Sequence, residues 1–248
     1  MASVGVIATF AGILQAIYPT IFSDAPAFML LGFVSIVSAI TYLVVRPKKN
    51  VTFGFSDERN VVSIEVADIF KYKSLVVTAD QAFSFKLEDI GEDSLMGQMQ
   101  VHSSDFIDQL KANLRLSEDG ALFEAGSVLD ISLLTSSTRV FVLACGRPSD
   151  EGSETGWTDL SKSLAGLWNH LRSKNITEVC IPVIGSGFSG TRMSHGSLMQ
   201  LILYSYYSAV ADRPVVRRLR VIVHPEDYNW DAWVRAKRAL VGLGMKQL

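Results

Sequence analysis

Charge is distributed very unevenly along this chain of 248 residues. Asp24 is the only charged residue among the first 45, although the chain carries 23 Lys and Arg and 25 Asp and Glu in all. Residues 4–22 and 26–45 are apolar runs, each long enough to cross a hydrocarbon core of about 30 Å as a helix. These runs are too apolar for a water-exposed domain, so the sequence divides into two physically different parts.

The two apolar runs are separated only by residues 23–25, so we expect an antiparallel pair of membrane-spanning helices over residues 1–46. Basic residues at 46–49 follow the second run, and the positive-inside rule then places both ends of this hairpin in the cytoplasm. The sequence therefore predicts a multi-pass membrane protein with both termini cytoplasmic. A cleavable secretory signal is the alternative, which the absence of Lys and Arg from residues 1–10 disfavours.

Residues 47–248 have the length and composition of one compact domain. Strand-like runs rich in β-branched residues alternate there with runs of helical periodicity. The expected strands are 51–55, 61–66, 74–78, 139–144, 178–184 and 219–223, and the expected helices are 97–109, 159–174, 195–211 and 230–241. This alternation predicts an α/β domain with a mixed, mostly parallel sheet flanked by helices. Sheets of this kind bind ligands beyond the carboxyl ends of their strands.

Several classes of function have little support in the composition. The net charge of −2 and the lack of a long Lys/Arg run argue against non-specific binding of nucleic acid. Cys145 and Cys180 lie in apolar strand-like runs without metal-ligand spacing, so we expect buried free thiols and no metal site. The four histidines are widely scattered, and no spacing typical of a catalytic triad occurs, so no catalytic residue is assigned.

The clearest local signal is a glycine-rich loop that follows the expected strand 178–184. The loop consists of Gly185, Ser186, Gly187, Phe188, Ser189 and Gly190. Three glycines allow backbone amides to converge without Cβ atoms in the way, and the start of the next helix adds positive potential, so a phosphate or diphosphate fits there. A turn that only reverses the chain is the alternative, and the spacing alone does not decide between them.

A second candidate loop precedes the first expected helix. It consists of Ser94, Leu95, Met96, Gly97 and Gln98. Backbone amides at the start of a helix would again be available to an anion. The alternative is a simple helix N-cap formed by Ser94.

The order of these pieces resembles the macro domain, an ADP-ribose-binding α/β module. Val66-Ala67-Asp68-Ile69 is similar to that family's Gly-Asp-Ile motif, the stretch IPVIGSGFSG resembles its second phosphate loop, and SLMGQ stands in the place of its first. The resemblance implies that Asp68 accepts a hydrogen bond from the adenine amino group and that the Ile69 backbone lies beside the adenine. It also implies that the ligand is an ADP-ribose derivative and that no cofactor is needed.

With the apolar runs in front of these motifs, the chain resembles the transmembrane-macro effectors of bacterial Thoeris antiphage defence systems. The resemblance implies a location in the bacterial inner membrane and an ADP-ribose-derived signal made from NAD by a partner TIR-domain enzyme. It further implies that the protein converts this signal into disruption of the lipid bilayer, which causes abortive infection. Because a hairpin with one charged residue offers no water-lined path as a single copy, we also expect the ligand to drive assembly into a homo-oligomer.

The resemblance also bears on whether the chain is an enzyme. Val77-Thr78-Ala79-Asp80 stands where hydrolytic macro domains carry an Asn-Ala-Ala-Asn run, which implies a binding module without catalytic residues. A membrane-anchored macro-domain ADP-ribosyl hydrolase is the enzyme alternative. A third hypothesis is a ligand-independent membrane scaffold, in which both glycine loops are only structural turns.

Overall fold

The structure is a computed structural model that describes residues 35–38, 49–55, 60–114, 122–149, 152–185, 191 and 193–248. The chain forms two compact units, Met1–Lys48 and Lys49–Leu248. Within the first unit, residues 35–38 are helical. The rest of the predicted hairpin over residues 1–46 lies outside the described residues.

The predicted location in the bacterial inner membrane, as a multi-pass protein with both termini cytoplasmic, is corrected by one finding. Across the described ranges, no helix combines the length and the apolar composition that a bilayer crossing requires. An apolar run is necessary for such a crossing, but the segment must also form a continuous helix, because a helix makes all of its backbone hydrogen bonds internally within lipid.

The second unit is built on a sheet with the strand order β4-β5-β3-β7-β8-β2-β1-β9, and β6 pairs with β5. The strands are β1 (Asn50–Gly54), β2 (Val61–Val66), β3 (Ser74–Asp80), β4 (Val128–Ser132), β5 (Arg139–Ser149), β6 (Gly152–Glu154), β7 (Glu178–Pro182), β8 (Arg218–Val223) and β9 (Lys246–Gln247). The five central strands, from β5 to β2, are parallel, and β1, β4, β6 and β9 pair antiparallel. The predicted mixed, mostly parallel sheet is confirmed.

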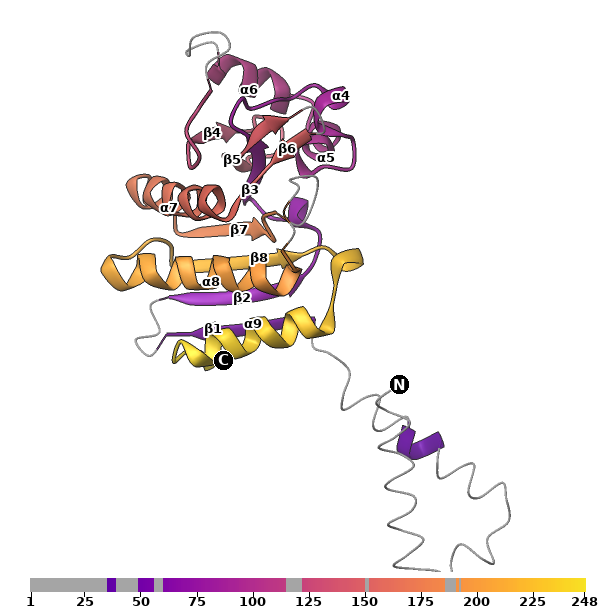
Figure 1. Ribbon diagram of the computed structural model, residues 1–248, viewed down its shortest axis with the longest axis vertical. Helices are drawn as coiled ribbons and strands as arrows, with labels where there is room; N and C mark the ends of the chain where they lie inside the picture. Colours follow the sequence, from indigo (N-terminus) through magenta and orange to yellow (C-terminus); the bar gives the residue numbers. More distant parts are fainter. Residues whose placement is uncertain are drawn as a thin grey trace, which may run out of the picture. The chain divides into compact units, whose positions relative to one another are not determined.

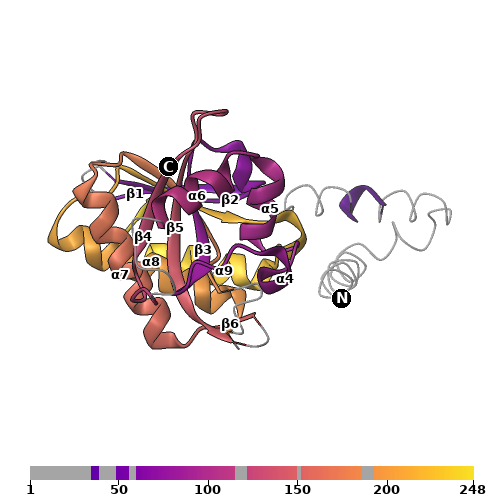
Figure 2. The same cartoon turned by 90° about the horizontal axis from the view of Figure 1, so that it is seen from above.

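Helices cover both faces of this sheet. They are α4 (Leu87–Ile90), α5 (Leu95–His102), α6 (Phe106–Leu114), α7 (Trp157–Ser173), α8 (His195–Asp212) and α9 (Trp230–Gly242), with 3-10 turns η1 (Ile69–Lys71) and η2 (Pro225–Asp227). Figure 1 shows α7, α8 and α9 side by side along one face, and Figure 2 shows α5 and α6 on the opposite side. Each layer encloses its own apolar core, because alternate residues of each strand point to opposite faces.

The helix predicted over residues 97–109 is two helices, α5 and α6. The side chain of Ser103, which is 5% exposed, donates to Asp105 Oδ1 over 2.6 Å, and Asp105 Oδ2 accepts from the Leu134 amide over 2.7 Å. Local hydrogen bonds of Ser and Asp side chains compete with the helical pattern and end it. The break turns α5 so that its first residues reach the cavity described below.

Candidate ligand-binding site

A cavity of about 590 Å³ opens at the carboxyl ends of the parallel strands. It is lined by residues 67–70, 78–80, 84, 89, 90, 93–96, 98, 145, 155, 160, 182–185, 222, 224, 226 and 227. All five parallel strands contribute residues from their ends or from the segments that follow them. This is the place where parallel α/β sheets bind ligands.

The turn after β2 carries Asp68 and Ile69, and both line the cavity. Asp68 is the N-cap of η1, and its Oδ1 accepts from the Phe70 amide over 2.9 Å. Ile69 is 7% exposed and packs in the core under α5 and α6, while the Phe70 ring stacks on His102 at 4.8 Å. One oxygen of Asp68 is thus committed to the turn, and Oδ2 accepts no hydrogen bond from the described residues.

The start of α5 forms a second wall. Ser94, Leu95, Met96 and Gln98 line the cavity, whereas Gly97 does not. Ser94 is the N-cap, as the alternative interpretation supposed: its Oγ accepts from the Gly97 amide over 2.9 Å and donates to the Gly91 carbonyl over 2.8 Å. The amides of Leu95 and Met96 donate to no described residue. The cap and an anion site are therefore compatible, because capping leaves two first-turn amides open.

The end of β7 and the residues that follow it, up to Gly185, form the third wall. Gly185 lines the cavity with a φ of +88°, and a Cβ there would lie 3.2 Å from Thr191 and 3.3 Å from Leu198, so the position requires glycine. Thr191 Oγ1 donates to the Gly185 carbonyl oxygen and so fixes the start of the loop. The other predicted loop residues, Ser186–Gly190, lie outside the described residues. The loop leads into α8, whose N-cap is Ser194.

The end of β3 places Thr78, Ala79 and Asp80 on the cavity wall. Asp80 is 8% exposed, and its Oδ1 accepts from the amides of Ala82 over 3.0 Å and Ser84 over 2.9 Å. The carboxylate therefore caps the turn that follows the strand.

Cys145, which also lines the cavity, is a protonated thiol. Its side chain is buried, and burial raises the pKa of the thiol to about 12, against a smaller effect of Ser163 in the other direction. A thiolate is the nucleophilic form of cysteine, so Cys145 contributes shape and apolar contact to the cavity.

Some wall residues have no role in the sequence-based prediction. Thr155 lies between β6 and α7, Leu160 is in the first turn of α7, and His224, Glu226 and Asp227 follow β8. The signal that could have found the last three is topological, because β8 is the last of the parallel strands and its carboxyl end must face the same cavity. Glycine and motif patterns do not contain that information.

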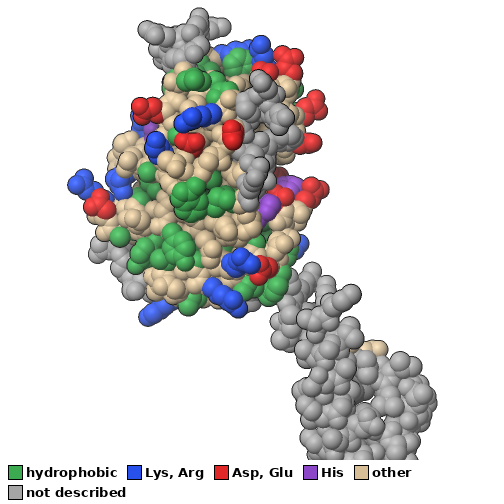
Figure 3. All heavy atoms as spheres, viewed as in Figure 1, with side chains coloured by type: hydrophobic (Ala, Val, Ile, Leu, Met, Phe, Trp, Pro, Cys, Tyr) green, Lys and Arg blue, Asp and Glu red, His purple; other side chains and the backbone are tan. Residues whose placement is uncertain are grey.

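Acidic side chains outnumber basic ones around this cavity. The described lining includes Asp68, Asp80, Asp89, Asp93, Glu226 and Asp227 and neither Lys nor Arg. Figure 3 shows acidic side chains at the edge of the domain where Figure 1 places α4. A diphosphate would therefore depend on backbone amides and helix N-termini for its binding energy. Among the described residues, no group of three or more His, Cys, Asp or Glu is arranged to hold a metal ion.

Solved macrodomains have the same fold. The Oceanobacillus iheyensis macrodomain with ADP matches at a TM-score of 0.58 and 15% sequence identity, over 79% of this chain and 98% of its own. The macrodomain of Mycobacterium tuberculosis DarG matches at a TM-score of 0.50 and 13% sequence identity, over 65% of this chain and 97% of its own. Thermosipho africanus DarTG in complex with ADP-ribose matches at a TM-score of 0.55 and 13% sequence identity. The match covers 73% of this chain and 46% of the DarTG chain. The fold of residues 49–248 is therefore that of a macro domain.

The particular family follows from the sequence. The family model described as Thoeris protein ThsA, Macro domain, matches residues 62–224, which is more than half of the chain, and the chain belongs to this family. The comparison with curated proteins found no match.

Proposed function

We propose that the cavity binds a nucleotide of the ADP-ribose type and that the protein acts as a sensor for it in antiphage defence. The observation that carries the proposal is the convergence of three separate chain segments at one cavity: the turn with Asp68, the start of α5 and the loop that begins at Gly185. Macrodomains of the same fold have been solved with ADP and with ADP-ribose, which supports this ligand class.

Each part of such a ligand has a chemically suitable wall. Asp68 Oδ2 is open and would accept from the adenine amino group, with the Ile69 backbone beside the ring. The diphosphate would lie between the open amides of Leu95 and Met96 and the loop that begins at Gly185. The distal ribose would then approach the end of β3, where Thr78 to Asp80 line the cavity.

In this proposal the domain binds its ligand and does not hydrolyse it. One oxygen of the Asp80 carboxylate, Oδ1, accepts from two amides of its own loop, and Ala79 beside it has no polar side chain. Cys145 is held as a thiol because burial raises its pKa to about 12. The commitment of Asp80 Oδ1 to the turn and the protonated state of Cys145 therefore support a binding role.

Membership of the Thoeris ThsA macro family supports a proposal for where the ligand comes from. In this proposal, a partner TIR-domain enzyme makes the ligand, an ADP-ribose derivative, from NAD. The bound protein would then assemble into a homo-oligomer. A ligand drives assembly only if it binds the assembled state more tightly than the separate one, so native mass should rise with ligand occupancy.

Calorimetry of the full-length chain with ADP-ribose tests the binding step. We expect saturable binding with a Kd of about 1 to 100 μM, equivalent to roughly 5 to 8 kcal/mol. The absence of heat and of any thermal shift with a folded protein would overturn the proposal. Release of free ADP-ribose from an ADP-ribosylated protein substrate would replace the binding role by the hydrolase alternative.

A further inference from the structure

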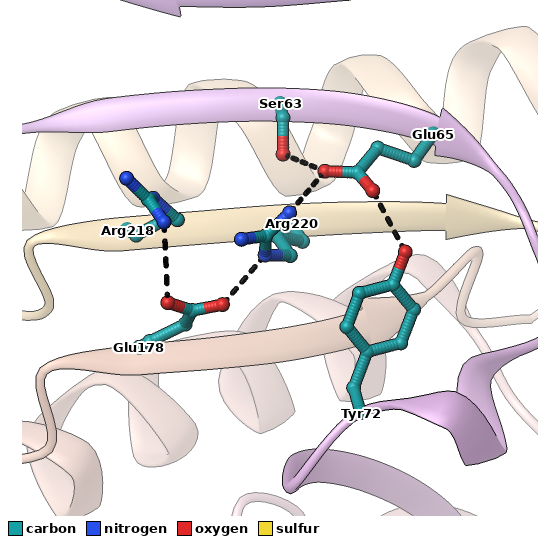
Figure 4. A network of polar contacts seen from close by, with 6 residues as sticks. All are labelled: Ser63, Glu65, Tyr72, Glu178, Arg218 and Arg220. Carbon is teal, nitrogen blue, oxygen red and sulfur yellow. Dashed lines mark hydrogen bonds and ion pairs between the residues drawn. The ribbon is translucent and has the colours of Figure 1, made fainter. Parts of the chain in front are cut away.

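A buried carboxylate lies on the sheet beside the cavity and outside it. Glu65, on β2, is 7% exposed and accepts three hydrogen bonds: from Ser63 Oγ over 2.6 Å, from Arg220 over 2.7 Å and from the Tyr72 hydroxyl over 2.7 Å. Figure 4 shows these side chains converging across β2, β8 and the end of η1. Burial raises the pKa of Glu65, but the three hydrogen bonds and the charge of Arg220 outweigh it and hold the pKa below its usual value.

The bond from Tyr72 to Glu65 closes a short loop of the chain. The residues between these two include Ala67, Asp68 and Ile69, which line the cavity. The start of the loop is fixed by sheet hydrogen bonds, with the Ala67 amide donating to Val223 over 3.1 Å. At its end, the first sheet pairing is made by the Lys73 carbonyl, which accepts from the Arg139 amide over 2.8 Å. Within the loop, the Tyr72 hydroxyl adds a side-chain anchor to β2 just before that pairing begins.

Tyr72 is also tied to the turn itself. Its backbone amide donates to the carbonyl of Ile69 over 3.2 Å and caps η1, so the position of Tyr72 sets the position of the turn. On its other side, the Arg220 guanidinium lies 5.5 Å from the centre of the Tyr72 ring. Arg220 is in turn held by Glu178 Oε1 on β7 over 2.6 Å. The phenol ring is thus fixed at its hydroxyl and at its face.

From this geometry we propose that Tyr72 and Glu65 are positioning residues for the adenine end of the ligand: their hydrogen bond holds the turn that presents Asp68 and Ile69 in its binding geometry before the ligand arrives. The inference rests on the proposed function of the cavity and deepens it. If the turn is already ordered, binding does not have to include the entropy cost of ordering it. The bond between Tyr72 and Glu65 can therefore raise the affinity without touching the ligand.

Tyr72→Phe tests the inference, because it removes one hydroxyl and keeps the ring on Arg220. In the full-length chain, we expect the Kd for ADP-ribose to rise about three- to tenfold. The Kd for ADP should rise by the same factor, because the two ligands share the adenosine end. Hydrogen exchange without ligand should become faster in residues 67–72 and stay unchanged in β7 and α8.

Arg218→Gln is the matched control. It removes an ion pair to Glu178 at 3.6 Å, at the far end of the same group of side chains, without touching Tyr72 or Glu65. We expect its two Kd values and its exchange in residues 67–72 to equal those of the wild type.

The possible results separate the inference from the proposed function. A Tyr72→Phe protein with wild-type Kd values would overturn the inference, and so would faster exchange spread evenly over the whole sheet, which would assign Tyr72 to general stability. A wild-type protein that bound neither nucleotide would overturn the proposed function itself. Weaker binding with faster exchange confined to residues 67–72 would support both.

Discussion

Gly97 lies so close to Gly91 that a Cβ atom on Gly97 would be 2.5 Å from the Gly91 carbonyl oxygen. The same Cβ would lie 2.8 Å from the carbonyl oxygen of Glu92. Real Cβ atoms do not approach backbone oxygens this closely, and the backbone cannot move away as a flexible side chain can. Gly97 therefore lets the first turn of α5 pack against the loop before it, and this contact sets where the open amides of Leu95 and Met96 point.

Gly97→Ala should weaken ADP-ribose binding about tenfold or more and destabilise the fold by about 1 to 3 kcal/mol, because the loop at residues 91–93 must shift to admit the methyl group. Calorimetry and urea unfolding measure the two effects.

Gly242→Ala is the control, since nothing lies within 4 Å of a Cβ at that last residue of α9. It should leave the Kd unchanged and raise the free energy of unfolding by up to about 0.5 kcal/mol. Equal Kd values for the two variants would contradict the role of Gly97.

Much of the sheet was predictable because its strands have a strong local pattern. The strand predicted at residues 61–66 is β2, and the one predicted at 219–223 differs from β8 by one residue. Strand β4 was not predicted, because what holds it lies elsewhere in the chain: Asp130 receives two hydrogen bonds from Arg139 on β5, over 2.7 and 2.5 Å. A single short run of residues does not contain that pairing.

The site was predictable where a residue type carried the signal. Asp68 and Gly185 stand in recognisable motifs, and both line the cavity. Thr155 and Glu226 line it too, but neither stands in a motif, since Thr155 lies between β6 and α7 and Glu226 follows β8. The division of the helix predicted at 97–109 depends likewise on Asp105, whose partner Leu134 is far along the chain. Tertiary contacts decide such positions.

Asp68→Asn separates the two duties of this side chain. The amide oxygen of asparagine can still accept from the Phe70 amide, so η1 should keep its cap and the unfolding free energy should change by less than about 1 kcal/mol. The group facing the ligand loses its charge and gains a donor, so ADP-ribose affinity should fall about tenfold.

Calorimetry on this variant needs a control of the same chemistry. Asp231→Asn also neutralises a carboxylate, one that pairs with Arg235 on the exposed side of α9 at 2.8 Å. It should bind ADP-ribose as the wild type does. If the two variants lost affinity equally, the effect would come from net charge and Asp68 would not contact the ligand.

Both cysteines should resist thiol reagents in the folded protein. Burial raises the pKa of Cys145 and of Cys180 to about 12, so at pH 8 only about one thiol in 10⁴ is ionised even before access is considered. Reaction with an aromatic disulfide at pH 8 should therefore be slow in buffer and release two equivalents rapidly in guanidinium. Rapid reaction of either thiol in buffer would contradict this prediction.

Stability should fall as the pH drops below about 6.5, and His170 should be one cause. Its Nε2 lies 3.6 Å from Asp130 Oδ2, and its ring packs edge-on against Phe141 at 6.0 Å. Burial lowers the pKa of His170, and the charges of Lys174 and Arg139 lower it further, which together outweigh the opposing effect of Asp130.

The sign of the pH effect follows from these groups. The unfolded chain takes up a proton on His170 near its ordinary pKa of about 6.5, whereas the folded protein does so only at lower pH. Protonation therefore favours the unfolded state between those two values, and the stability contributed by neutral His170 is lost as the pH falls through that window. The pKa of Asp130 is also lowered on balance: burial raises it, but Arg139 and His170 outweigh that effect, so the corresponding loss for Asp130 comes only below about pH 4.

His170→Gln should make the free energy of unfolding less dependent on pH between 7 and 5, at some cost in stability at pH 7. Urea unfolding of the wild type and the variant at pH 7, 6 and 5 measures the difference. His224→Gln is the control, because His224 is exposed after β8 and is not part of the Asp130 cluster. Its pH profile should follow that of the wild type. Parallel profiles for the wild type and His170→Gln would contradict the assignment, because the group that loses its proton on folding would then lie elsewhere.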